Sequence, residues 1–145
     1  MREPDLHYEQ HFNFALEEVT QNLSENLHLT WHYGLLYIDK YSDEQGLPVS
    51  VITGIRNKDD TVHHVRVHLV SVQKGAHARI DIWRVTTAGW PFPNLTLATN
   101  AREELMDIVD DAVVFCQVPY KETGSVFSWL RNMFSGELET RKRRD

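Results

Sequence analysis

The sequence predicts a single α+β domain. One helical pattern, four strand-like runs and a second helical pattern follow one another within 145 residues. Hydrophobic residues make up 41% of the chain and charged residues 25%, as expected of a packed domain. Polar turns separate the strand-like runs, and such short connections favour antiparallel neighbours. We therefore expect an antiparallel sheet of about four strands with both main helices on one face.

The first helix is predicted to run from about residue 5 to residue 26. Apolar side chains recur there at steps of three and four residues, which builds one apolar stripe along a helix. The same stretch carries polar residues off that stripe, as a helix covering a sheet does. The stripe consists of Phe12, Ala15, Leu16, Val19, Leu23 and Leu27.

The four strands are predicted at residues 28–40, 49–55, 62–72 and 78–86. Apolar and polar side chains alternate in these runs, which is the period of a half-buried strand. In the third run, for example, Val65 and Val67 oppose His64 and Arg66. The alternation predicts one face against the helices and one open face.

The second main helix is predicted to begin after Asn100. Its apolar stripe is expected to pack on the same sheet face as the first helix, with Asp107, Asp110 and Asp111 on a solvated face. Residues 1–120 form the predicted domain, and residues 121–145 add a short amphipathic helix and a basic tail. The stripe of the second helix consists of Leu105, Ile108, Val109, Ala112, Val113 and Cys116.

Charge and composition narrow the classes of function. The net charge of −6 disfavours nonspecific nucleic-acid binding by the whole domain. The single cysteine, Cys116, cannot form an intramolecular disulfide, and its place on an apolar stripe predicts a buried, inert thiol. The sequence has neither the apolar core of a signal peptide nor an apolar run long enough to span a membrane, so we expect a cytoplasmic protein. No phosphate-binding or dinucleotide motif occurs, and we predict no cofactor and no enzymatic activity.

The eight histidines suggest one alternative, a small-ligand or metal-dependent enzyme. His7 and His11 are spaced as two imidazoles on neighbouring helical turns would be. His64 and His68 have the same spacing in a predicted strand, where residues four apart lie roughly 13 Å apart and cannot bind one ion alone. A metal site would therefore need partners across strands. The residues of this alternative are His32, His64 and His68.

A second alternative is binding of single-stranded nucleic acid. Arg66, Arg79 and Trp83 are predicted to share the open sheet face. Arginines there could contact phosphates, and the indole could stack on a base. The negative total charge makes this alternative weaker than binding of a protein.

The leading hypothesis is a non-enzymatic protein-binding module such as an adaptor, chaperone, inhibitor or immunity-like protein. Prolines hold two large aromatic residues in the segment after the last strand, and aromatic anchors are enriched in binding hot spots. The segment 125–134 carries more apolar surface than a short terminal helix buries. The partner is expected to be another protein with a basic surface, or a second copy of the chain. The proposed anchors are Trp90, Phe92, Phe127, Trp129, Leu130 and Phe134.

Overall fold

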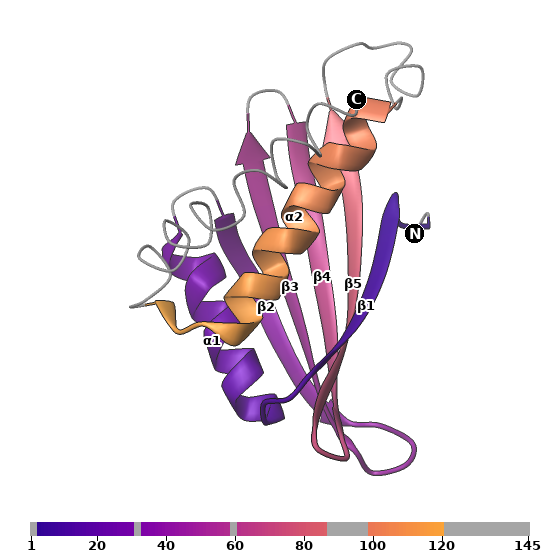
Figure 1. Cartoon of the computed structure of the whole chain (residues 1–145), viewed down its shortest axis with the longest axis vertical. Helices are drawn as coiled ribbons and strands as arrows, with labels where there is room; N and C mark the ends of the chain where they lie inside the picture. The colour runs from indigo at the N-terminus through magenta and orange to yellow at the C-terminus, as the bar shows by residue number, and fades with distance from the viewer. Residues whose placement is uncertain (1–2, 31–32, 59–60, 87–98, 121–145) are drawn as a thin grey trace.

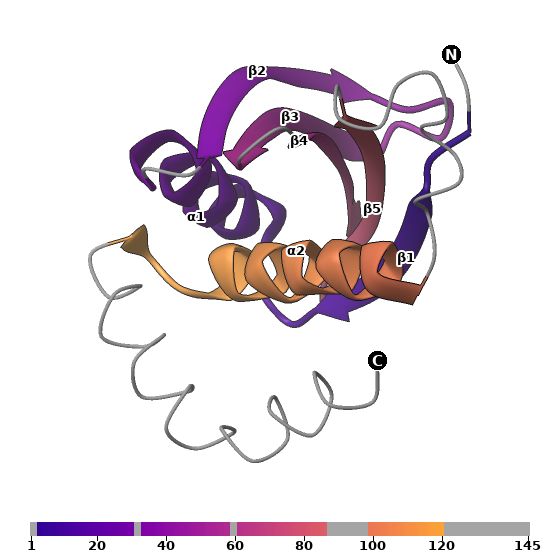
Figure 2. The same cartoon turned by 90° about the horizontal axis from the view of Figure 1, so that it is seen from above.

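The structure, a computed structural model, describes residues 3–30, 33–58, 61–86 and 99–120. Within them a five-stranded antiparallel sheet has the order β1-β5-β4-β3-β2. Figure 1 shows α1 and α2 in front of this sheet, and Figure 2 shows the sheet curving around both helices. The α+β class is confirmed, as is the predicted placement of both main helices on one sheet face. The concave face is therefore covered, and the convex face is not covered by either helix.

The N-terminal part differs from the prediction, because residues 6–12 form a strand. β1 spans Leu6–Phe12 and pairs with β5, and α1 spans Leu16–Leu29. Leu6, Tyr8 and Phe12 pack on the core while His7 and Glu9 are exposed, which is the alternation of a strand. The predicted helix began too early because Phe12 fits the helical stripe equally well. His7 and His11 consequently lie along a strand and not on neighbouring helical turns.

The four predicted strands are confirmed with shifted ends. β2 spans Tyr33–Ser42, β3 Pro48–Lys58, β4 Thr61–Val72 and β5 Gly75–Thr86. His28 and Leu29, predicted to open the first strand, close α1 instead. A register shift between Leu35 and Tyr37 interrupts the alternation of β2, which is an edge strand.

The core lies between the concave sheet face and the apolar stripes of α1 and α2. α2 spans Thr99–Gln117, and its predicted stripe is buried apart from the partly buried Val113. Cys116 is fully buried, as predicted, and burial raises the pKa of its thiol. The sheet contributes its concave side chains to the same core, namely Ile52, Val65, Val67, Leu69, Ala76, Ala78, Ile80 and Ile82.

Two buried asparagines of α1 hold the C-terminal end of α2. Asn26 donates from Nδ2 to the main-chain oxygens of Phe115 (3.0 Å) and Val118 (2.8 Å). Asn22 donates to the main-chain oxygen of Cys116 at 3.2 Å. The last carbonyls of a helix have no partner within it, and leaving them unpaired in a core is costly. These amides therefore satisfy the end of α2 and fix its position on α1.

Gly75 provides a test of how β1 is held against the β4–β5 turn. Gly75 has a φ of 145°, and a Cβ atom there would lie against the carbonyl oxygen of Phe12 in β1. Gly46 also has a positive φ, of 81°, but has open space around it. We expect Gly46→Ala to lower the free energy of unfolding by about 1–2 kcal/mol. Gly75→Ala should lower the free energy of unfolding by a further ~1–3 kcal/mol, because the added Cβ atom forces the backbone near Phe12 to move.

Urea denaturation of both variants measures the difference. Equal losses in Gly75→Ala and Gly46→Ala would mean that the end of β1 is free to move away from the turn.

Candidate functional site

Three surfaces of the described chain carry side chains that chemistry or binding could use. They are a polar row on the concave face, a charged ladder on the convex face and β2, the last strand of the described sheet. The register between strands determines which residues share a face of the sheet, and it therefore determines which side chains form each surface.

The polar row crosses four strands at the end of the sheet near the start of α2. Tyr33 of β2 pairs with Arg56 of β3, Arg56 pairs with His63 of β4, and His63 pairs with Arg84 of β5. Directly opposite residues in antiparallel strands point to the same face. We call Tyr33, Arg56, His63 and Arg84 the polar row.

Glu104 of α2 joins two members of the polar row. Its Oε2 atom accepts a hydrogen bond from Nε of Arg84 at 2.6 Å and lies 3.1 Å from Nε2 of His63. Desolvation would raise the pKa of Glu104, but these two partners outweigh it and hold the pKa below its usual value. The carboxylate is therefore ionised, and it orients the imidazole of His63 through Nε2–H.

The imidazole of His63 is neutral, and only one of its two nitrogens has a hydrogen-bond partner among the described residues. The side chain is 0% exposed, and burial lowers its pKa. With the proton on Nε2, the Nδ1 atom carries a lone pair, and no described residue donates a hydrogen bond to it. Such an unsatisfied buried atom costs about 1–3 kcal/mol.

Asp111 of α2 contacts Tyr33, at the opposite end of the polar row from Arg84. It accepts a 2.6 Å hydrogen bond from the hydroxyl of Tyr33, whose ring also packs edge-on against Phe115. Burial raises the pKa of Asp111 and of Tyr33. The prediction that Asp111 belongs to a solvated acidic face is therefore wrong, because the helix turns this carboxyl toward β2. Asp107 is exposed.

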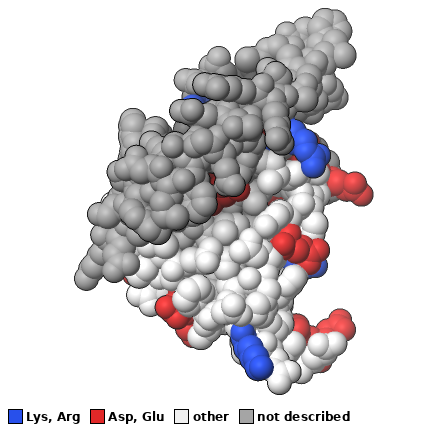
Figure 3. Space-filling view, viewed as in Figure 1, with Lys and Arg blue, Asp and Glu red and all other residues white. Residues whose placement is uncertain are grey.

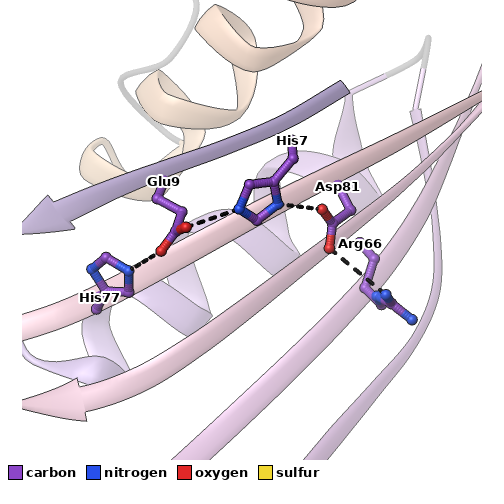
Figure 4. Close-up of polar contacts among 5 residues, drawn as sticks. All are labelled: His7, Glu9, Arg66, His77 and Asp81. Atoms are coloured by element: carbon purple, nitrogen blue, oxygen red, sulfur yellow. Dashed lines mark hydrogen bonds and ion pairs between the residues drawn. The ribbon is translucent and has the colours of Figure 1, made fainter. Parts of the chain in front are cut away.

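The charged ladder lies on the convex face and crosses β1, β5 and β4 (Figure 4). Glu9 binds His77 at 2.7 Å and His7 at 2.9 Å, and His7 binds Asp81 at 2.5 Å. Asp81 lies 3.7 Å from Arg66. Because both nitrogens of His7 face carboxylates, the imidazolium fits the geometry best. These partners raise the pKa of His7, and hydrogen bonds from His7 and His77 lower that of Glu9 to about 2.

Arg66, Arg79 and Trp83 share the convex face, as predicted from the alternation. Trp83 is only 8% exposed, however, and the guanidinium of Arg66 lies 4.9 Å from its ring centroid. A base could stack on this ring only after Arg66 moved. Figure 3 shows the helix side of the molecule, where the described Lys and Arg side chains are scattered, and does not show the convex face. The geometry therefore gives little support to the nucleic-acid alternative.

The histidines of the metal alternative are spread out in the described chain. His64 and His68 lie on the convex face of β4, four residues apart, and His32 lies outside the described residues. Among described residues, no group of three or more His, Cys, Asp or Glu side chains is arranged to bind a metal ion. His63, the histidine that faces the helices, was not among those proposed. Its signal is its phase, since it lies on the same face of β4 as Val65, Val67 and Leu69.

β2, which has no neighbour on its outer side among the described strands, carries exposed apolar side chains. Tyr37 is 55% exposed and Tyr41 45% exposed, and Leu36, Ile38 and Leu47 are also exposed. Proteins usually protect such edges with charged side chains or by covering them with another element. On the concave side of β2 the charged side chain is Lys40, whose Nζ atom lies 3.7 Å from a carboxylate oxygen of Glu17 in α1. The β2–β3 turn projects beyond the helices at the bottom of Figure 1. We call Leu36, Tyr37, Ile38, Tyr41 and Leu47 the β2 edge.

The predicted partner-binding anchors all lie outside the described residues, so they stay predictions. They are Trp90, Phe92, Phe127, Trp129, Leu130 and Phe134.

Compared with protein-family models, with curated proteins and with solved structures, the chain matches none of them significantly. Among the described residues, no helix combines the length and apolarity needed to cross a membrane.

The hydrogen bond between Tyr33 and Asp111 provides a test of the polar row. Tyr33→Phe keeps the ring contact with Phe115 but removes the donor to a largely buried carboxyl group. We expect the free energy of unfolding to fall by about 1–3 kcal/mol. A double-mutant cycle with Asp111→Asn, measured by urea denaturation, isolates the pairwise term. Additive losses would contradict a direct interaction.

The charged ladder provides a test with pH. The pKa of His7 is raised above its usual 6.5 in the folded protein, so its contribution to stability is complete below pH 6.5. That contribution is lost as the pH rises through the raised value. His7→Gln should therefore destabilise the protein at pH 6 more than at pH 9, by less than about 1 kcal/mol because the side chain is half exposed.

Thermal unfolding across this pH range measures the difference. His28→Gln, at the exposed end of α1, is a control for the loss of an imidazole. A loss in His7→Gln that grows with pH would contradict the ladder.

Proposed function

We propose that this protein is a non-enzymatic protein-binding module and that the β2 edge is one of its contact surfaces. The supporting observation is the concentration of strongly exposed apolar side chains on one edge strand. An edge strand offers unpaired backbone donors and acceptors, so a partner can add an extended segment to the sheet. The adjacent tyrosines supply amphipathic rings of the kind enriched in interfaces.

The charges near the β2 edge favour a partner with a basic contact surface. Asp39 lies between Tyr37 and Tyr41 along the strand, and Asp43 and Glu44 follow in the turn. Together with the net charge of −6, these carboxylates would steer a basic partner to the edge. A second copy of the chain would instead bring like charges together. The anchors predicted at residues 90–92 and 127–134 stay part of the protein-binding hypothesis.

The other β edge of the sheet is less suited to this role. β1 has only seven residues, carries His7 and Glu9 of the charged ladder, and has no strongly exposed large apolar side chain. Charged side chains on an edge discourage pairing with another chain. The contrast between the two edges supports β2 as the edge used for binding.

Site-specific photo-crosslinking in the native cells tests this proposal. A photoreactive phenylalanine derivative replaces Tyr37 or Tyr41 in one set of cells. In a control set it replaces Val85, which is 46% exposed on β5 and lies away from the β2 edge. We expect both tyrosine positions to give an adduct with the same protein and the Val85 position to give none.

The pattern of adducts decides the outcome. The adduct should disappear when Ile38→Lys is added, because an inserted charge at the edge opposes strand pairing. Equal adducts from all three positions, or no adduct from either tyrosine position, would contradict the proposal. An adduct whose mass is twice that of the chain would identify a second copy as the partner and contradict a basic one.

A further inference from the structure

On the convex side of β2, one carboxylate lies between two exposed tyrosines. Tyr37, Asp39 and Tyr41 occupy alternate positions of the strand, so their side chains share one face of the sheet. Asp39 is exposed and forms no hydrogen bond or ion pair with another described residue. Its direct neighbour in β3 is Val51, and the next residue in that row is His68 of β4. The charge of Asp39 is therefore not compensated by the strands beside it.

The concave side of β2 differs in charge. Lys40 is the charged residue there, and its Nζ atom already has a carboxylate oxygen of Glu17 at 3.7 Å. Ile38, the next residue on that side, is apolar and 38% exposed. A segment added to β2 consequently meets an uncompensated charge on the convex side only.

The pairing of β2 limits where such a segment can be added. The register with β3 shifts between Leu35 and Tyr37 and is regular from Tyr37 to Ser42. A bulge disrupts the hydrogen-bond ladder of its strand, so a regular added strand pairs beyond it, in a stretch with Asp39 near its centre. The residue directly opposite Asp39 would have its Cβ atom about 4.5–5.5 Å away, and Tyr37 and Tyr41 would lie diagonally at about 7–8 Å. A long side chain spans those distances.

The chemistry of these three side chains selects arginine for the opposite position. Strand addition removes water from Asp39, which is costly unless a cation pairs with the carboxylate. A guanidinium can bind a carboxylate through two hydrogen bonds and stack on an aromatic ring at the same time. The ring of Tyr41 is positioned for this, because its hydroxyl lies 3.3 Å from Nε2 of His68. A segment without a cation would leave Asp39 unpaired, so the same carboxylate discriminates against other sequences.

We propose that the β2 edge binds an extended segment of its partner that places an arginine opposite Asp39, between the rings of Tyr37 and Tyr41. The residues two positions before and after this arginine lie opposite the tyrosines and are apolar. The residues between them face the concave side and are uncharged. This inference rests on the proposed function, because it requires that β2 accept an added strand, and it specifies the sequence of that strand.

The test uses four synthetic peptides that differ only at their central residue. The first has the sequence Thr-Val-Thr-Arg-Thr-Val-Thr, whose order of side chains is the same in both directions. The others replace arginine by lysine, glutamine or glutamate. Each is titrated to millimolar concentration while the amide resonances of β2 are followed by NMR in ¹⁵N-labelled protein. We expect saturable shifts of the amides of residues 37–41 with the arginine peptide. Binding should be about fivefold or more weaker with glutamine, weaker still with glutamate, and intermediate with lysine.

Asp39→Arg reverses the charge at the centre of the surface. This variant should prefer the glutamate peptide over the arginine peptide. Glu44→Arg, in the neighbouring turn, changes the net charge by the same amount and is the matched control, which should keep the preference for arginine. Both residues are exposed, so both variants are expected to fold.

The proposal is wrong if no peptide shifts these amides, if the lysine or glutamine peptide binds as tightly as the arginine peptide, or if Asp39→Arg still prefers arginine. Equal loss of the preference in Glu44→Arg would also overturn it, because net charge would then explain the binding. These results differ from a failure of the proposed function. A specific crosslinked adduct at Tyr37 and Tyr41 without any preference for arginine contradicts the arginine alone, whereas absence of adducts contradicts the β2 edge as a contact surface.

Discussion

The attachment of α2 at both ends is the constraint on which the rest of this structure depends. At its C-terminal end, the amides of Asn22 and Asn26 bind main-chain oxygens of the last turn. Near its N-terminal end, Glu104 binds Arg84 and His63 across the sheet. Both contacts lie where burial makes an unpaired polar group costly. Because neither end can slide, the apolar stripe between them is held over the concave face.

The two faces of the sheet differ in their polar contacts. On the convex face, the charged ladder satisfies its own members, so its histidines are committed to carboxylates of neighbouring strands. On the concave face, the polar row is satisfied only in part, since Nδ1 of His63 and the guanidinium of Arg56 have no partner within the described chain. The abundance of histidine is therefore a poor guide to chemistry here. Buried imidazole nitrogens without a hydrogen-bond partner among the described residues occur on both faces, at Nδ1 of His63 and at Nδ1 of His68.

The candidate site could have been found in part from phase. His63 and Arg84 have the same phase as the core-facing apolar residues of their strands, and a polar residue in the apolar phase is expected to face the core. Arg56 shares its phase with Ser50 and Gly54, so phase alone does not predict its place. Their assembly into one row required the register between strands, which connection lengths do not fix. Asp111 was mistaken for a solvated residue because it borders the apolar stripe of α2. Its orientation toward Tyr33 follows from the rotation of the helix on the sheet.

The sequence by itself determined the α+β class, the order of the four meander strands and most of the buried stripe of each helix, because period and turn residues are local properties of the chain. Of the stripe predicted for the first helix, Phe12 belongs to β1 and Ala15 is exposed. Only the tertiary structure decided that residues 6–12 form a fifth strand. Pairing with β5 is what allows β1 to bury the side chains of Leu6, Tyr8 and Phe12 on one face of the sheet. The tertiary structure also decided which polar residues come into contact. The contacts between Tyr33 and Asp111 and between His63 and Glu104 join residues that are far apart in the chain. Such contacts depend on register and helix rotation, which are set by the packing of the whole core.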